Sequence, residues 1–136
     1  MKAIVIKIID SALSYLGTPY KWGGTDRQGL DCSGLMLIAF KGGGISIPRV
    51  SEDQAKIGPQ IDPEELNLGD MVFFTDVPGN KKITHVGLVS SLSAESKTVT
   101  FIHASSSKGV MESDLNSDYW QSVFLLAIRP SAFLNN

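Results

Sequence analysis

Apolar residues near the start of the chain recur at intervals of three and four positions, with polar residues between them. The apolar positions are Ile4, Ile8, Ile9, Ala12, Leu13 and Leu16. This spacing predicts an amphipathic helix that packs one face on a core. We expect the helix to end at Gly17, because Pro19 two residues later cannot continue it. Its polar face is not basic, so the pattern does not indicate a helix on a membrane surface.

A second helix is predicted after a glycine-rich loop over residues 18–30. The run from Leu35 to Phe40 is apolar at every position, which is typical of a central, buried helix. Asp31 occupies the N-cap position, and glycines at positions 42–44 end the run. We therefore expect a helix from Cys32 to about Lys41.

The segments on either side of this second helix have weaker patterns. The loop before it carries Tyr20 and Trp22, which can either line a cleft or pack the loop onto the core. After it, three prolines interrupt the region between Ile45 and Gly69, where only a short helix near Ser51–Lys56 is expected.

From Gly69 onward the period changes to two, which is the spacing of strands. The expected strands are Met71–Thr75, Thr84–Leu92, Thr98–Ser105 and Ser122–Arg129. Helices first and strands afterwards predict an α+β fold, with N-terminal helices packed against one C-terminal antiparallel sheet. No repeat or linker is visible, so we expect one domain over residues 1–136.

Composition narrows the class of protein. A chain of 136 residues with 43% apolar and 19% charged residues is typical of a soluble globular domain. The net charge is −2 and no basic run occurs, so nucleic acid is not an expected partner. No stretch approaches the ~18 apolar residues of a membrane span. Lys7 and Asp10 interrupt any signal-peptide core, so no signal peptide is visible.

The candidate chemistry concentrates in Asp31-Cys32-Ser33-Gly34, which contains the only cysteine of the chain. A single cysteine excludes an internal disulfide framework and leaves an inert buried thiol or a reactive one. A helix N-terminus favours the reactive interpretation, because its unpaired N–H groups and dipole stabilise a thiolate. The cysteine and histidine spacings do not match a zinc motif, so no metal site is expected.

Two histidines fall on neighbouring predicted strands. If their hairpin pairs Leu92 with Thr98, Gly87 lies opposite His103, and His85 lies two positions further along the same strand. Because side chains alternate along a strand, both imidazoles then point to one sheet face as diagonal neighbours about 7–8 Å apart. We expect the start of the second helix to dock on that face.

A cysteine and two histidines in this arrangement fit nucleophilic catalysis. One imidazole takes the thiol proton and later delivers it to a leaving amine, while a third polar group fixes its tautomer. Each histidine alone is more commonly a satisfied structural residue. Two on one face, with a lone cysteine at a helix start, favour the nucleophile interpretation.

Several separate blocks, in order, resemble the NlpC-type cysteine peptidases, a papain-like family that cleaves bacterial cell-wall peptides. The blocks are Gly17-Thr-Pro-Tyr-Lys-Trp-Gly-Gly24, Asp31-Cys-Ser-Gly34, Ile47-Pro-Arg49 with Ser51 and Gln54, Leu68-Gly-Asp-Met-Val-Phe-Phe74, Thr84-His-Val-Gly-Leu88 and Phe101-Ile-His-Ala104. The resemblance covers roughly residues 10–105, and the order of the blocks makes it more specific than any single motif.

The resemblance implies roles for individual residues. Cys32 would be the nucleophile, His85 the general base and His103 the residue that orients it. Tyr20 would place its hydroxyl near the oxyanion, together with the backbone N–H of Cys32.

The resemblance also concerns the residues beside the nucleophile. In relatives that require a free N-terminal alanine on the substrate, the positions of Asp31 and Ser33 bind that end, so the same residues here permit that activity. Arg49 is expected to be structural and to bond loop backbone.

The implied reaction is hydrolysis of the amide between D-γ-glutamate and a diamino acid in peptidoglycan stem peptides or muropeptides, through an acyl-enzyme and without a cofactor. The alternatives are a low-turnover binding or phage-tail assembly module, and acyl transfer to an amine. With no export signal or wall-binding module visible, recycling in the cytoplasm, delivery to the wall and export with a missing leader all stay open. The oligomeric state also stays open.

Overall fold

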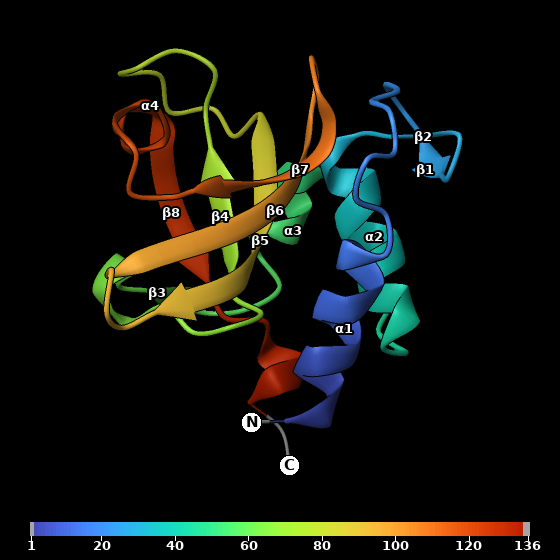
Figure 1. Cartoon of the computed structure of the whole chain (residues 1–136), viewed down its shortest axis with the longest axis horizontal. Helices are drawn as coiled ribbons and strands as arrows, with labels where there is room; N and C mark the ends of the chain where they lie inside the picture. The colour runs from blue at the N-terminus through green and yellow to red at the C-terminus, as the bar shows by residue number, and fades with distance from the viewer. Residues whose placement is uncertain (1, 135–136) are drawn as a thin grey trace.

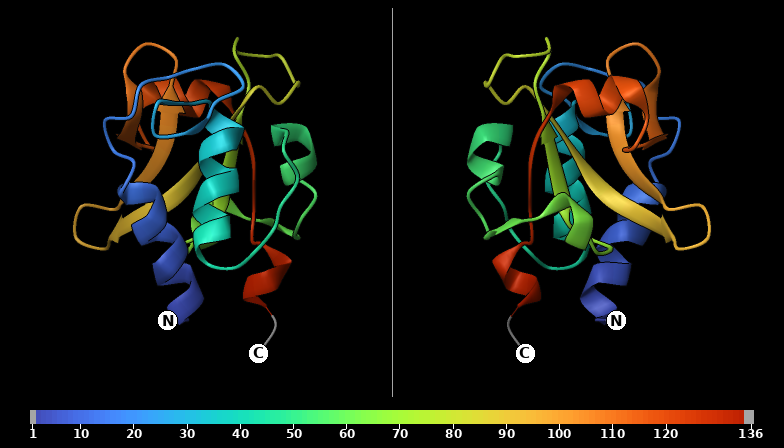
Figure 2. Two further views of the ribbon diagram at one scale, coloured as in Figure 1. Left: turned by 90° about the vertical axis from the view of Figure 1, so that its right-hand side faces the viewer. Right: turned by 90° about the vertical axis from the view of Figure 1, so that its left-hand side faces the viewer.

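In the computed structural model, which describes residues 2–134, two N-terminal helices pack against one face of a six-stranded antiparallel sheet (Figures 1 and 2). The helices are α1 (Ala3–Leu13), α2 (Cys32–Gly42), α3 (Ser51–Gln54) and α4 (Asp118–Val123), with 3-10 turns η1 (Pro63–Glu65) and η2 (Ser131–Phe133). The sheet strands are β3 (Gln60–Ile61), β4 (Met71–Phe74), β5 (His85–Ser93), β6 (Thr98–Ser105), β7 (Gly109–Asp114) and β8 (Phe124–Ile128). Their order is β3-β8-β4-β5-β6-β7, and β1 (Thr25–Asp26) pairs with β2 (Gly29–Leu30) separately. The predicted α+β fold is confirmed.

Both predicted N-terminal helices are present. α1 ends at Leu13 rather than Leu16, and its last turn continues irregularly to Gly17, which has a positive φ of 86°. α2 begins at Cys32 as predicted, because the Asp31 carboxylate accepts a 2.7 Å hydrogen bond from the Gly34 N–H. Ile8 of α1 and Phe40 of α2 are fully buried in the core that the helices share with the sheet.

Side chains alternate between two apolar layers, one on each face of the sheet. On β4, Met71 and Phe73 join the core beneath α1 and α2, whereas Val72 and Phe74 join a second core on the other face. The second core includes Val123 at the end of α4, with Trp120 packed against it. α1 and α2 therefore cover one face, and α4 packs on the other.

The β5–β6 hairpin has the predicted register only at its open end. Leu88 pairs with Ile102, which is the predicted alignment, and continuing it places Gly87 opposite His103. Near the turn, however, Leu92 pairs with Val99, so the predicted pairing with Thr98 is wrong. The register shifts by one residue between Val89 and Ser91, because a β-bulge inserts an extra residue into β5.

Two elements in the C-terminal third differ from the prediction. β7 was not predicted, and it extends the sheet beyond β6. The last strand starts at Phe124 rather than Ser122, because residues 118–123 form α4. Beside this strand, Arg129 donates two 2.9 Å hydrogen bonds to the buried Asp70 carboxylate and so links β8 to the turn before β4. No helix within residues 2–134 is long and apolar enough to cross a membrane.

Candidate active site

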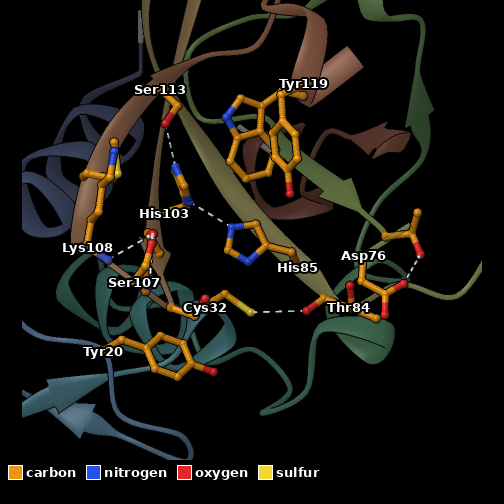
Figure 3. A pocket seen from close by; sticks show the side chains of 16 residues that line it. Tyr20, Cys32, Asp76, Thr84, His85, His103, Ser107, Lys108, Ser113 and Tyr119 are labelled. Carbon is orange, nitrogen blue, oxygen red and sulfur yellow. Dashed lines mark hydrogen bonds between the residues drawn. The ribbon is translucent and has the colours of Figure 1, made fainter. Parts of the chain in front are cut away.

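A cleft of about 510 Å³ lies where β5 begins and β6 ends, beside the first turn of α2 (Figure 3). Its lining residues are Tyr20, Cys32, Thr75, Asp76, Thr84, His85, His103, Ala104, Ser105, Ser106, Ser107, Lys108, Met111, Ser113, Tyr119 and Trp120. Four of the six predicted site residues are among them: Tyr20, Cys32, His85 and His103. The other two, Asp31 and Ser33, are not.

Cys32 is the first residue of α2, and its thiol lies 3.9 Å from the backbone oxygen of Thr84. Burial raises the pKa of the thiol, and the neighbouring Asp31 carboxylate raises it further. Backbone N–H groups at Val86 and at the helix start lower this pKa, but their effect is smaller. The helix N-terminus therefore acts on the thiol in the expected direction without overcoming its burial, and Cys32 is protonated in the resting structure.

The two histidines form a direct hydrogen bond across the hairpin. His85 Nε2 lies 2.9 Å from His103 Nδ1, with the two rings nearly perpendicular at 88°. Burial lowers the pKa of His85 to about 4. Burial, reinforced by His85, lowers the pKa of His103 to about 3. Both imidazoles are consequently neutral at pH 7, and the second ring nitrogen of His85 is directed toward Cys32 (Figure 3).

The imidazoles lie on the sheet face opposite α1 and α2, so the expectation that the helix start docks on their face is wrong. His85 stacks on Trp120 of α4 with ring centroids 5.6 Å apart and an interplanar angle of 19°. His103 stacks on Phe101, and it meets Trp120 edge-on at 4.9 Å. Cys32 instead packs against the core on the helix side. Cys32 and His85 nevertheless line the same cleft, at the end of the sheet.

The two aromatic residues of the loop before α2 have different environments. Tyr20 lines the cleft, whereas Trp22 is 85% exposed. Burial raises the pKa of the Tyr20 hydroxyl, and the adjacent Cys32 and Asp31 raise it further. Tyr20 therefore keeps its proton and can donate a hydrogen bond into the cleft.

Asp31 and Ser33 are buried behind Cys32 and bind Arg49. The Arg49 guanidinium donates a 3.0 Å hydrogen bond to the Asp31 carboxylate and a 2.7 Å hydrogen bond to the Ser33 hydroxyl. The expectation that Arg49 bonds loop backbone is therefore wrong, because its partners are two side chains. Burial alone would raise the pKa of Asp31, but Arg49 and the N–H groups of Gly34 and Gly23 outweigh it and lower that pKa.

The cleft residues that sequence reasoning missed include Lys108, Ser113 and Trp120. The turn at Lys108-Gly109, where Gly109 has a φ of 78°, is the signal that a further strand follows His103. Ser117 followed by an acidic residue is a helix-start signal that would have found α4 and its tryptophan. Within residues 2–134, no group of three histidine, cysteine, aspartate or glutamate side chains is placed to hold a metal ion.

Comparison with known proteins agrees with this arrangement. The family model described as the NlpC/P60 family matches residues 17–129. The chain belongs to this family. NlpC/P60 domains have papain-like α+β folds, which agrees with the helices, sheet and cleft described above.

Two named relatives and one solved structure show how similar the chain is to other NlpC/P60 proteins. This chain is 41% identical over 127 residues to the probable endopeptidase NlpC of Escherichia coli (strain K12). That alignment covers 93% of this chain and 78% of the relative. It is 46% identical over 81 residues to a γ-D-glutamyl-L-lysine dipeptidyl-peptidase of Bacillus subtilis (strain 168). That alignment covers 60% of this chain and 27% of the relative. The crystal structure of an NlpC/P60 family protein from Bacillus cereus superposes with a TM-score of 0.80 at 31% identity, over 93% of this chain and 40% of that one. Several NlpC/P60 relatives are thus much longer than this chain.

Proposed function

We propose that residues 1–136 form one NlpC/P60 cysteine endopeptidase domain that hydrolyses the amide between D-γ-glutamate and a diamino acid in peptidoglycan peptides. The observation that carries the proposal is the series of Cys32, His85 and His103 at one cleft. The names of the relatives support the bond class, since one is a γ-D-glutamyl-L-lysine dipeptidyl-peptidase and another a probable endopeptidase.

The first half of the reaction transfers the acyl group to the enzyme. His85 Nε2 is engaged by His103, so His85 Nδ1 accepts the Cys32 proton as the sulfur attacks the carbonyl carbon. The resulting oxyanion accepts hydrogen bonds from the Tyr20 hydroxyl and the Cys32 backbone N–H. His85 then gives its proton to the departing amine, and a thioester remains on Cys32.

The second half returns the enzyme to its starting state. Water attacks the thioester while His85 takes one of its protons, and the second oxyanion uses the same donors. Collapse breaks the carbon–sulfur bond, and His85 returns its proton to the Cys32 sulfur. The released γ-carboxylic acid then loses the second proton of the water to solvent. No cofactor enters this scheme.

The charge states of Cys32 and His85 indicate when the thiol proton is transferred. With the pKa of Cys32 raised and that of His85 lowered to about 4, both groups are neutral before substrate binds. Attack and proton transfer are then coupled, because a preformed thiolate–imidazolium pair is not available in the free enzyme. His85 needs no prior deprotonation at neutral pH, so it is ready to act as a base.

The polarity of the cleft fits the proposed peptide. Lys108 and Asp76 line the cleft on opposite sides of Cys32 and His85 (Figure 3). A D-glutamate linked through its γ-carboxyl keeps a free, anionic α-carboxylate, and a diamino acid carries an additional amine. We assign Lys108 to the α-carboxylate and Asp76 to the diamino acid, since opposite charges then meet on both sides of the scissile bond.

A digest of purified muropeptides of known composition tests the proposed bond. Wild-type protein and Cys32→Ala are incubated with them under reducing conditions between pH 5 and 9, and products are identified by mass spectrometry. We expect wild-type protein alone to produce fragments that end in γ-D-glutamate. Intact muropeptides at every pH, or cleavage at another bond, would overturn the assignment.

Two alternatives share this cleft. The raised pKa of Cys32 favours a low-turnover binding module, such as a phage-tail assembly component, because a protonated thiol is a weak nucleophile. Muropeptide binding without cleavage in the same digest would identify that module. Acyl transfer uses the same thioester, and an added amine that appears in the product would identify it.

Asp31 and Ser33 have a structural role that is compatible with their predicted contact to a free N-terminal alanine. Their polar atoms already bind Arg49 and the start of α2. We propose that they primarily hold the Cys32 backbone in place. Cleavage of matched peptides with free and acetylated N-terminal alanine would test the substrate contact, which predicts a preference for the free amine.

A further inference from the structure

Ser113 on β7 contacts the imidazole pair from the side away from the cysteine. Its Oγ lies 2.8 Å from His103 Nε2, and His103 Nδ1 lies 2.9 Å from His85 Nε2. Four side chains thus stand in series: Cys32, His85, His103 and Ser113 (Figure 3). β7 presents Ser113 at this point because it pairs Ser113 with Phe101, two residues before His103 on β6.

The two hydrogen bonds couple the tautomers of both rings. A neutral imidazole has one N–H and one bare nitrogen, so the proton placement on one ring dictates the donor on the next. For His85 Nδ1 to accept a proton, the His85 hydrogen must lie on Nε2 and be donated to His103 Nδ1. His103 must then carry its own hydrogen on Nε2, where the available acceptor is the hydroxyl of Ser113.

The opposite chain of hydrogen bonds is unproductive. If Ser113 donates to His103 Nε2, His103 donates from Nδ1 to His85 Nε2, and the His85 hydrogen moves to Nδ1. The nitrogen directed toward Cys32 then has no lone pair for the thiol proton. Only one of the two directions permits base catalysis.

We propose that Ser113 is a positioning residue that accepts the His103 Nε2–H hydrogen bond and thereby keeps His85 in its base-competent tautomer. The proposal rests on the proposed function for its catalytic consequence, while the tautomer assignment stands on the geometry of the resting protein. The Ser113 hydroxyl lies beside His103 at the edge of the cleft, so we assign its effect to His103.

The same acceptor is required throughout the reaction. Once His85 has taken the thiol proton, both of its nitrogens carry hydrogen, and Nε2 can only donate to His103 Nδ1. His103 must therefore keep its hydrogen on Nε2, and Ser113 must keep accepting it. His103 is 1% exposed and packed between Phe101 and Trp120, so bulk water does not reach its ring freely. Loss of the hydroxyl would leave a buried N–H without its partner.

The ring protons can be observed directly by long-range ¹H–¹⁵N NMR, because the chain contains only two histidines. Wild-type protein, Ser113→Ala and Ser113→Thr are compared without substrate, and kcat/KM is measured on muropeptides. Ser90→Ala is the matched control. Ser90 is a half-buried serine of the same sheet, and it bonds Glu112 and no histidine.

We expect wild-type protein and Ser113→Thr to carry hydrogen on Nε2 of both histidines. In Ser113→Ala the single tautomer should be lost, with kcat/KM lower by about ten-fold. Ser113→Thr should recover most of that loss, because threonine keeps the hydroxyl and suits a strand. Hydrogen on His103 Nδ1 in wild-type protein, or unchanged tautomers and activity in Ser113→Ala, would overturn the proposal. If no muropeptide is cleaved, the tautomer spectra still decide the structural claim, and only the proposed function fails.

Discussion

Arg49 and Asp31 form an ion pair at 3.0 Å directly behind the candidate nucleophile. The carboxylate also accepts backbone N–H bonds from Gly34 at 2.7 Å and Gly23 at 2.9 Å. It thus caps α2, anchors the preceding loop and remains charged next to Cys32. Since this charge raises the pKa of the thiol, Arg49 has an electrostatic as well as a structural effect.

Replacing Arg49 with methionine should affect both properties. We expect the free energy of unfolding to fall by about 1–2 kcal/mol, a modest value because the guanidinium is partly exposed. The pKa of Cys32 should rise further, because the Asp31 charge is no longer balanced. Urea denaturation measures the first effect, and the rate of iodoacetamide labelling against pH measures the second. Arg49→Lys should be intermediate; a lysine variant equal to methionine in both assays would argue against a charge effect.

Trp120 of α4 packs against both imidazoles and shields them from water. Its replacement by alanine should let water reach His85 and raise the pKa of that histidine from about 4 toward 6.5. The acid limb of the kcat/KM profile should move to higher pH with it, and the free energy of unfolding should fall by about 2 kcal/mol. NMR titration of His85 measures the pKa directly. Trp22→Ala removes the exposed tryptophan and serves as the control; an equal pKa shift there would contradict the role of Trp120.

The low histidine pKa values predict an unusual pH profile. Because kcat/KM reports the free enzyme, its acid limb should lie near pH 4 rather than near 6.5. Its alkaline limb should lie above the ordinary thiol range near 8.5, since the pKa of Cys32 is raised. An acid limb between pH 6 and 7 would show that the imidazoles are more hydrated than the structure indicates.

The free energy of unfolding should depend on pH through the same two histidines. Between pH 6.5 and about 4 the unfolded chain binds a proton at His85 that the folded chain does not, so the free energy of unfolding falls as pH falls. The maximum loss is on the order of 3 kcal/mol for this histidine, and His103 acts in the same direction. Urea denaturation at pH 7.5 and 4.5 measures the slope, and a flat profile would contradict the neutral, buried pair.

Lys108 should set affinity for the acyl side of the substrate. Lys108→Met should raise KM about three- to five-fold on peptides with free D-glutamate and leave kcat nearly unchanged, as for a partly exposed ion pair. Peptides with D-isoglutamine, whose α-carboxyl is amidated, should show no such difference between the two proteins. Lys41→Met, at the far end of α2, is the matched control. An equal KM increase on both kinds of peptide would remove the carboxylate assignment.

The two N-terminal helices and the shared face of the histidines could be predicted from the sequence, because each depends on a local pattern. Apolar periodicity located α1, and a continuous apolar run located α2. Asp31 predicted the start of α2 because a carboxylate at that position satisfies N–H groups. Alternation along β5 and β6 placed His85 and His103 on one face, and their hydrogen bond bears out that proximity.

The remaining features depend on contacts that a local pattern does not encode. The bulge near Ser90 shifts the hairpin register by one residue between the turn and the open end. No residue there has an obligatory bulge conformation, so the sequence does not signal this shift. β7 is a half-polar edge strand whose alternation is weak, so Ser113 could not be placed beside His103. Burial of Cys32 likewise arises from tertiary packing, which is why its raised pKa opposes the expectation from the helix N-terminus alone.

The central claim is that Cys32 carries the acyl group, and rapid-quench mass spectrometry tests it most directly. Wild-type protein is mixed with muropeptide, quenched in acid within milliseconds to seconds, and digested with pepsin. The account predicts a γ-D-glutamyl acyl group on the peptide that contains Cys32, removable by neutral hydroxylamine as expected for a thioester. It also predicts no cleavage by Cys32→Ala. Cleavage of the same bond by Cys32→Ala at the wild-type rate, or the acyl group on another residue, would contradict the account.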